Sequence, residues 1–270
     1  MRRKFWGLQR HPILYYIRYI LLAKNTRKSE AELVGRFDKV NQISDIPKLY
    51  FEVNKTIGIS DDADEFDKAL QISSFLRSRT PVGPSLSSSS KRTLYGMLYG
   101  KGGVCNDFSM VFNNFCLINN IPSKEWNCVD RFYKTTYGHT FNEIFSSRHQ
   151  KWIAIDSHKG IYFLDNDNSP MSVIELFESL RNHQPLRLAY ISGYRPPNPE
   201  RLKHVFSGKS IPFVTHNYKA AVVDNYLEKF QSLPMFLINA LLILQRKNYS
   251  FVFVLDDYRR QLLPESLRNA

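Results

Sequence analysis

Cysteine is scarce in this chain, whose 270 residues contain only Cys105, Cys116 and Cys128. Three cysteines form no evident disulfide framework, which indicates a reducing, cytoplasmic compartment. The sequence has no Cys-x-x-Cys pair and no His-x-x-x-His pair, so it does not indicate a compact zinc site. We therefore expect no metal and no cofactor. Cys116, in an apolar helical pattern, and Cys128, in a strand-like segment, are better explained by packing.

Long apolar runs are also missing, since a membrane-spanning helix needs roughly twenty consecutive apolar residues. The runs 12–23, 233–244 and 251–255 are all shorter. Arg18 interrupts the first run, and no small-residue cleavage site follows it. We therefore expect neither a spanning helix nor export by this segment.

Acidic residues are absent from the first 29 positions, which carry eight of the positive charges behind the net charge of +12. This basic arm includes the aromatic, apolar run 12–23. The combination predicts a helix that either docks on the protein itself or makes peripheral contact with an anionic membrane, here the inner face of the membrane. No nucleic-acid-binding module can be recognised, so no nucleic acid partner is expected.

Cys105 follows a glycine pair, Gly102 and Gly103, with one residue between. Glycines permit a tight turn, and apolar residues at three- and four-residue steps over 106–118 predict that a helix follows. A cysteine that opens a helix meets the positive end of the helix dipole and backbone N–H groups, which lower the pKa of its thiol. Since most free cysteines are packing residues, the interpretation of Cys105 as a nucleophile depends on its partners.

Two partners follow downstream, His139 and Asp156. His139 lies in the segment 137–145, whose alternating polar and aromatic residues predict a strand, and Asp156 closes a second apolar strand over 151–156. The short polar segment 146–150 between them is typical of a hairpin loop, which makes the two strands antiparallel neighbours. Both side chains can then face the end of the helix that Cys105 opens.

Further positions share a pattern with this trio: a glycine before the cysteine, an acid and an aromatic after it, an Asn-Ile-Pro helix stop, and a tryptophan four residues before the aspartate. These are Gly103, Asp107, Phe108, Asn120, Ile121, Pro122 and Trp152. In these motifs the stretch 105–156 resembles the transglutaminase-like superfamily, a branch of the papain-like cysteine enzymes, in its bacterial-type form. Asparagine suits the helix stop because it tolerates the left-handed conformation, and proline prevents the helix from continuing.

The resemblance implies Cys105 as nucleophile, His139 as general base and then general acid, and Asp156 as the group that orients the imidazole. The expected activity is that of a cysteine-dependent acyl-transfer enzyme, which passes an acyl group through a thioester to water or to an amine. Its substrate would be a protein, a peptide or another molecule with an amide or ester bond. The alternative is a catalytically inactive binding or scaffold protein, associated with the membrane surface.

The sequence departs from the family pattern at two places. Phe141 stands where many relatives have tryptophan, which keeps an aromatic wall, and Ser157 and His158 follow Asp156 where proline and threonine are common. His158 is interpreted as a decoy or as a group behind the triad, because the other strand already supplies a base.

The resemblance implies an α+β fold with a papain-like core, in which the nucleophile-bearing helix packs on an antiparallel sheet, and the composition adds helices at both termini. We expect an N-terminal helical region with a Ser-rich loop over 1–90, a catalytic core over 91–195, and a mostly helical extension over 196–270 that begins at a proline cluster. The loop 81–90 is either a solvated connector or one rim of the cleft. Ser172 and Glu175 predict a helix with a capping box.

Overall fold

A computed structural model of the chain describes residues 42–60, 62–129, 138–191, 198–216, 220–245 and 251–255. The basic arm and its apolar run 12–23 lie outside these residues, so both predictions about that segment stay predictions. Within the described ranges, no helix is both long enough and apolar enough to cross a bilayer.

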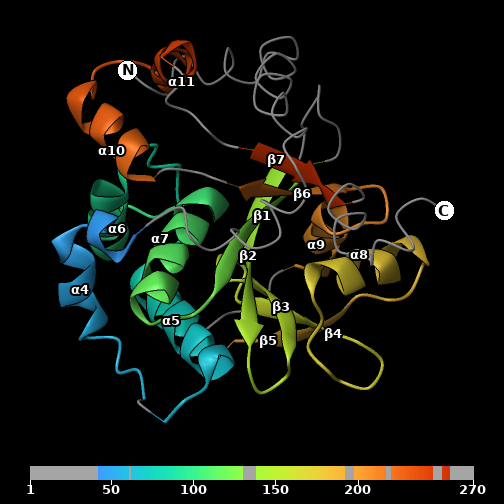
Figure 1. Ribbon diagram of the computed structural model, residues 1–270. Helices are drawn as coiled ribbons and strands as arrows, with labels where there is room; N and C mark the ends of the chain where they lie inside the picture. The colour runs from blue at the N-terminus through green and yellow to red at the C-terminus, as the bar shows by residue number, and fades with distance from the viewer. Residues whose placement is uncertain are drawn as a thin grey trace, which may run out of the picture.

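An antiparallel sheet of seven strands forms the centre of the described molecule, in the order β5-β4-β3-β2-β1-β6-β7 (Figure 1). Its strands are β1 (Ser123–Val129), β2 (Gly138–Ser146), β3 (Lys151–Asp156), β4 (Ile161–Leu164), β5 (Arg187–Tyr190), β6 (Ile211–His216) and β7 (Phe251–Val254).

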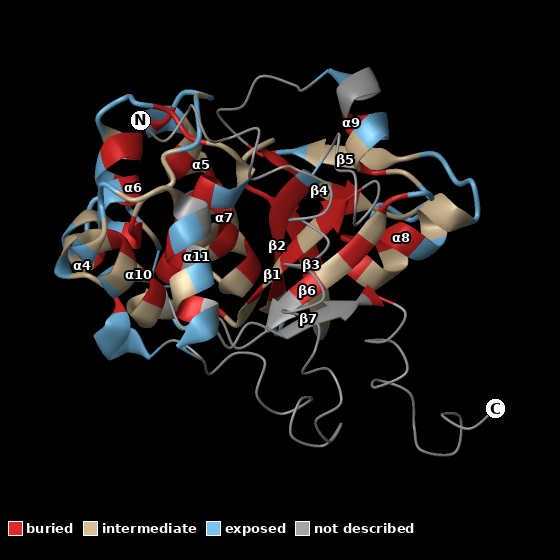
Figure 2. Cartoon of the chain, turned by 90° about the horizontal axis from the view of Figure 1, so that it is seen from above, coloured by how far each residue is buried: buried red, intermediate tan, exposed pale blue. Residues whose placement is uncertain are grey.

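Helices cover both faces of this sheet, as the view from above shows (Figure 2). One face carries α4 (Lys48–Asn54), α5 (Glu65–Arg79), α6 (Ser90–Leu98) and α7 (Cys105–Ile118), and the other carries α8 (Val173–Arg181) and α9 (Pro199–Val205). The helices α10 (Ala220–Lys229) and α11 (Met235–Leu244) pack on each other, and α10 contacts the start of α6. The predicted α+β fold, with a helix that begins at Cys105 packed on an antiparallel sheet, is confirmed.

The central helix α7 follows the predicted apolar spacing. Phe108, Val111, Phe112 and Phe115 are all fully buried between the sheet and the surrounding helices. The helix ends as the sequence indicated, because Asn120 adopts a positive φ of 56°. The N–H of Ile121 then donates to the carbonyl of Cys116 at 2.8 Å, which satisfies a carbonyl of the last turn.

Side chains cap the starts of two helices, α8 and α5. Ser172 and Glu175 form the predicted capping box at α8. The cap of α5 is Asp64, whose side chain accepts from the N–H of Asp67 at 2.8 Å. Pro47 is the residue before α4. This position suits proline, which is tolerated at the beginning of a helix but not in its interior.

The hairpin of β2 and β3 is confirmed, with Asn142 paired to Ile155. Its turn contacts α5, since the N–H and the hydroxyl of Ser147 both donate to Glu65, at 3.0 and 2.7 Å. The two strands that carry His139 and Asp156 are therefore held against the helical layer at their far end.

The C-terminal third contributes to the same sheet, because β6 pairs with β1 and β7 pairs with β6. It also contacts the helical layer through α10, where Asp224 accepts from the N–H of Ser90 at 2.8 Å and from its hydroxyl. The division of the chain at residues 90 and 195 stays a prediction.

Candidate active site

The three predicted site residues lie at the ends of three elements. Cys105 is the first residue of α7, His139 lies at the start of β2, and Asp156 is the last residue of β3. The fold brings them together, since His139 bonds the carboxylate of Asp156 and its charge acts on the thiol of Cys105.

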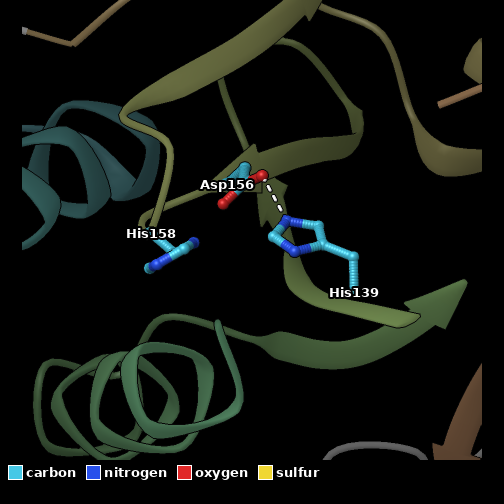
Figure 3. Close-up of side chains that lie close together, drawn as sticks. All are labelled: His139, Asp156 and His158. Carbon is cyan, nitrogen blue, oxygen red and sulfur yellow. Dashed lines mark hydrogen bonds and ion pairs between the residues drawn. The ribbon is translucent and has the colours of Figure 1, made fainter. Parts of the chain in front are cut away.

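His139 and Asp156 form a short, buried pair (Figure 3). The Nε2 atom of His139 lies 2.6 Å from Oδ2 of Asp156, and the two residues are 5% and 0% exposed. The other carboxylate oxygen accepts from the N–H of Lys159 at 2.9 Å. The position of the carboxylate is thus fixed from two sides, and one nitrogen of the imidazole is committed to it.

Burial and charge act in opposite directions on this pair. Burial alone would raise the pKa of Asp156, but the His139 imidazolium and the N–H of Lys159 outweigh it and hold that pKa below its ordinary value. Burial likewise opposes a charge on His139, but Asp156 and Cys105 raise its pKa well above the ordinary value. At neutral pH the imidazolium form is favoured.

The thiol of Cys105 is half-buried, and burial opposes its ionisation. The charge of His139, a hydrogen bond with its ring and a hydrogen bond from the N–H of Thr140 together lower the pKa of Cys105 below the ordinary thiol value. This environment favours a thiolate–imidazolium ion pair, which is the reactive state of a cysteine nucleophile.

Aromatic rings hold the imidazole on its remaining sides. Phe141, from the next position on the same face of β2, lies nearly parallel to His139, with an interplanar angle of 12° and a centroid distance of 6.2 Å. Phe206, just after α9, meets the ring edge-on at 5.7 Å. The aromatic wall at Phe141 was expected from the sequence, whereas Phe206 is distant in the chain and carries no local signal.

His158 lies beside Asp156, in the turn 157–160 that follows β3 (Figure 3). Its ring packs edge-on against Phe108 at 5.3 Å and lies 5.9 Å from the ring of His139. Burial lowers the pKa of His158 to about 3, so the ring is neutral. The structure thus places it next to the pair that His139 and Asp156 form.

Asp107 joins the Ser-rich loop to the start of α7. Its Oδ2 atom accepts from the N–H of Val104 at 3.0 Å and from the N–H of Leu86 at 3.1 Å. The sequence singled out this acid only by resemblance, without its structural role. The contact places part of the loop 81–90 beside the segment that leads to Cys105.

The glycines before the nucleophile allow this approach of two backbones. Gly102 has a φ of +81°, and a Cβ atom on it would lie 2.5 Å from the Cα atom of Gly83. The N–H of Gly83 donates to the carbonyl of Gly103 at 3.1 Å. A side chain at residue 102 would therefore separate the loop from the turn that precedes Cys105.

The other two cysteines are buried, as predicted. Cys116 is part of the core between α7 and the sheet, and Cys128 lies in β1, with its thiol 3.7 Å from the carbonyl of Val205. Burial raises the pKa of both thiols. Neither belongs to a cluster of potential metal ligands among the described residues.

A half-buried carboxyl, Glu125, was missed by the sequence. It lies on β1 and accepts a hydrogen bond from the hydroxyl of Ser109, a residue of α7, at 3.2 Å. Burial raises the pKa of Glu125 to about 7. The only sequence signal was that Ser109 lies four residues, about one helical turn, after Cys105, which does not identify its partner.

The comparisons with known proteins identify one domain. Residues 53–157 match the family model of the transglutaminase-like superfamily, a range that includes Cys105, His139 and Asp156. Searches of curated proteins and of solved structures gave no match.

Proposed function

Because residues 53–157 form a transglutaminase-like domain, we propose that this chain is a cysteine-dependent acyl-transfer enzyme with Cys105, His139 and Asp156 as its catalytic triad. The observation that supports the proposal most directly is the position of His139, which lies 2.6 Å from the carboxylate of Asp156 and whose charge lowers the pKa of the Cys105 thiol. A nucleophile, a base and an orienting acid in this chain of contacts are the elements of covalent acyl transfer.

In the acylation step, the thiolate of Cys105 attacks the carbonyl carbon of an amide or ester and forms a C–S bond. The imidazolium of His139 gives its proton to the leaving amine or alcohol as the C–N or C–O bond breaks, which leaves a thioester and a neutral imidazole. The carboxylate of Asp156 stabilises the charged ring and fixes its orientation.

In the second step, the neutral imidazole takes a proton from the acceptor as the acceptor attacks the thioester. Water as acceptor gives hydrolysis, and an amine gives transamidation. The sulfur leaves as a thiolate and the imidazolium is restored, so no further proton source is needed.

Backbone groups at the start of α7 can stabilise the developing negative charge. The N–H of Cys105 is in the first turn of the helix, where it has no carbonyl partner within the helix and meets the positive end of the dipole. We propose this group as the first oxyanion donor.

Alkylation of the thiol as a function of pH tests the ion pair. We expect iodoacetamide to modify Cys105 rapidly well below pH 8, because the thiolate persists there, and we expect His139→Ala to slow the reaction at pH 6 by about tenfold or more. Peptide mass analysis would locate the modified cysteine.

The chain contains its own background control for this experiment. Cys116 and Cys128 are buried thiols with raised pKa values, so a Cys105→Ala variant should show only their slow reaction. If Cys105 titrates as an ordinary thiol, and His139→Ala leaves its rate unchanged, the proposed triad is wrong.

The acyl donor can be identified through the intermediate. Incubation of the protein with a cell extract, followed by acid quenching and mass analysis, is expected to show an added mass on the peptide that contains Cys105. A Cys105→Ser variant should trap the acyl group as a more stable ester, provided that the weaker hydroxyl nucleophile reacts. The added mass gives the composition of the acyl group.

A further inference from the structure

His139, Asp156 and His158 form a compact group of two imidazoles and one carboxylate (Figure 3). One nitrogen or oxygen ligand atom from each residue lies within 4.8 Å of the other two. All three are provided by the end of the β2–β3 hairpin and the turn 157–160. The proposed catalytic roles account for His139 and Asp156 but leave His158 without a use.

The imidazole of His158 is an unusual buried group. A neutral imidazole has one N–H donor and one acceptor nitrogen, and neither nitrogen of His158 has a hydrogen-bond partner within the described part of the chain. Both oxygens of Asp156 already accept hydrogen bonds, from His139 and from the N–H of Lys159. Buried polar atoms without partners are rare in proteins, and an ion is one recognised explanation for them.

We propose that His158, Asp156 and His139 bind a divalent zinc ion, and that this binding reversibly blocks the catalytic imidazole. Two imidazoles and a carboxylate are a ligand set that suits zinc. A fourth position would be taken by water. This site differs from the cysteine-based zinc site that the spacing of the cysteines argued against.

The geometry requires a small adjustment. Zinc bonds of about 2.0–2.2 Å place tetrahedral ligand atoms roughly 3.3 Å apart. The Nε2 atom of His139 and Oδ2 of Asp156 are 2.6 Å apart, so they must separate slightly as the ion replaces their hydrogen bond. A nitrogen of His158, within 4.8 Å of its partners, must approach them by about 1.5 Å at most. His158 can supply this movement, because its ring nitrogens make no hydrogen bonds to described residues that would have to break.

Metal binding and catalysis would exclude each other. The ion takes the lone pair of the His139 nitrogen, so the imidazolium must release its proton to the buffer before it can bind. A metal-bound imidazole can no longer donate that proton to a leaving group. The metal binding itself does not depend on the proposed acyl-transfer function, whereas its inhibitory consequence rests on that function.

Cobalt(II), which takes zinc's tetrahedral geometry and has a visible spectrum, is the probe that tests the site. The full chain is titrated with Co²⁺ in a reductant without thiols, both as wild type and with Cys105→Ala, so that the thiolate cannot account for binding. We expect saturable visible absorption in both, and displacement of Co²⁺ by Zn²⁺. His158→Ala should weaken the binding by at least about tenfold.

The controls separate this site from other histidines and from misfolding. His149, in the turn at the other end of the β2–β3 hairpin, provides the matched control, and His149→Ala should bind Co²⁺ as the parent does. His158→Gln fills the same space without a strong ligand, so it repeats the test if His158→Ala unfolds.

Two results would overturn the inference: absence of saturable binding in the parent proteins, or equal binding by the parents and both His158 variants. Because Co²⁺ binding is read from absorption, it remains informative if the alkylation experiment on Cys105 fails. Conversely, a reactive Cys105 without Co²⁺ binding would retain the acyl-transfer proposal and remove the metal site.

Discussion

At the level of single residues, His139 is held by several neighbours at once. It bonds the carboxylate of Asp156, the thiol of Cys105 helps to raise its pKa, and two aromatic rings pack against it. Its orientation is therefore set by surrounding groups and not by its own rotamer preference. Changes to these neighbours are expected to affect the protonation of the ring before they affect the fold.

Asp156→Asn tests the electrostatic part of this arrangement. Asp156 raises the pKa of His139, so its neutral replacement should shift the titration of the His139 ring to lower pH, as followed by NMR of the ring signals. Asp67→Asn, at an exposed carboxylate that pairs with Arg148, serves as the control. An unchanged titration of His139 in Asp156→Asn would contradict the assignment.

The same substitution has a predictable pH signature in stability. Because the pKa of Asp156 is lowered in the folded state, its ionised carboxylate stabilises the fold at pH values above the ordinary pKa of an aspartate. This stabilisation is lost as the pH falls through the lowered pKa. Because the pKa of His139 is raised, its charged ring stabilises the fold fully at pH values below the ordinary pKa of 6.5. This stabilisation is lost as the pH rises through the raised pKa. The loss in unfolding free energy of Asp156→Asn, on the order of 3 kcal/mol, should therefore be largest near neutral pH, as measured by urea denaturation.

Glu125 is predicted to make the fold less stable as the pH rises, which is the opposite of the effect of Asp156. Its pKa is raised from 4.5 to about 7, so the folded state retains a proton that the unfolded state has lost, and stability should decline as pH rises across that interval. Glu125→Gln keeps the hydrogen bond to Ser109 without the charge. We expect it to remove this decline and to stabilise the protein at pH 8, as seen in thermal unfolding at a series of pH values. A parallel pH dependence in both proteins would refute the prediction.

At the level of elements, the start of α7 depends on contact between two backbones. The loop at Gly83 approaches Gly102 more closely than any side chain would permit, and Asp107 binds the loop at Leu86. The helix that carries the proposed nucleophile is thus positioned partly by a segment about twenty residues earlier in the chain.

Gly102→Ala measures this close approach, with Gly58→Ala as the matched control. Both glycines have positive φ angles, +81° and +74°, but a Cβ on Gly58 would meet nothing within 4 Å. Gly58→Ala should therefore cost only the conformational penalty of about 1–2 kcal/mol, as measured by chemical denaturation. Gly102→Ala adds a backbone clash, so its loss should be clearly larger, and equal losses would contradict the proposed contact.

At the level of the whole molecule, the C-terminal helices are connected to the loop beside the site. Asp224 and Glu228 of α10 accept hydrogen bonds from Ser90 and Ser89, and Arg92 pairs with Glu228 at 3.0 Å. These residues link α10 to the end of the Ser-rich loop, whose other part contacts the start of α7.

Asp224→Ala is expected to loosen this link. The N–H and hydroxyl of Ser90 would lose their acceptor at a mostly buried position, at a cost of about 1–3 kcal/mol. Hydrogen exchange should then become faster in α10 and in residues 86–92, while the β2–β3 hairpin keeps its protection. Asp167→Asn, in the exposed turn after β4, should change neither region. Unaltered exchange in α10 would show that other contacts hold it.

Local chemistry explains which parts of the structure could be predicted. The helix start at Cys105, the left-handed Asn120 and the cap at Ser172 follow from the preferences of a few adjacent residues, and all three are confirmed. The hairpin of β2 and β3 followed from periodicity and a short polar loop.

Other features depend on residues that are distant in the chain. Three contacts join segments that no local sequence pattern connects. They are the packing of Phe206 against His139, the hydrogen bond from Ser109 to Glu125, and the hydrogen bond from the N–H of Leu86 to Asp107.

The pairing of β2 with β3 has a consequence for how the site can fail. Continuing the ladder by one pair beyond Asn142 and Ile155 sets Phe141 opposite Asp156, so His139 and Asp156 occupy one face of the sheet as diagonal neighbours. Because side chains alternate between faces, a slip of one residue would turn one of them away from the other. The alignment of base and acid is therefore a property of backbone pairing, and thermal loss of this hairpin is expected to abolish the site in one step, without a partly aligned population.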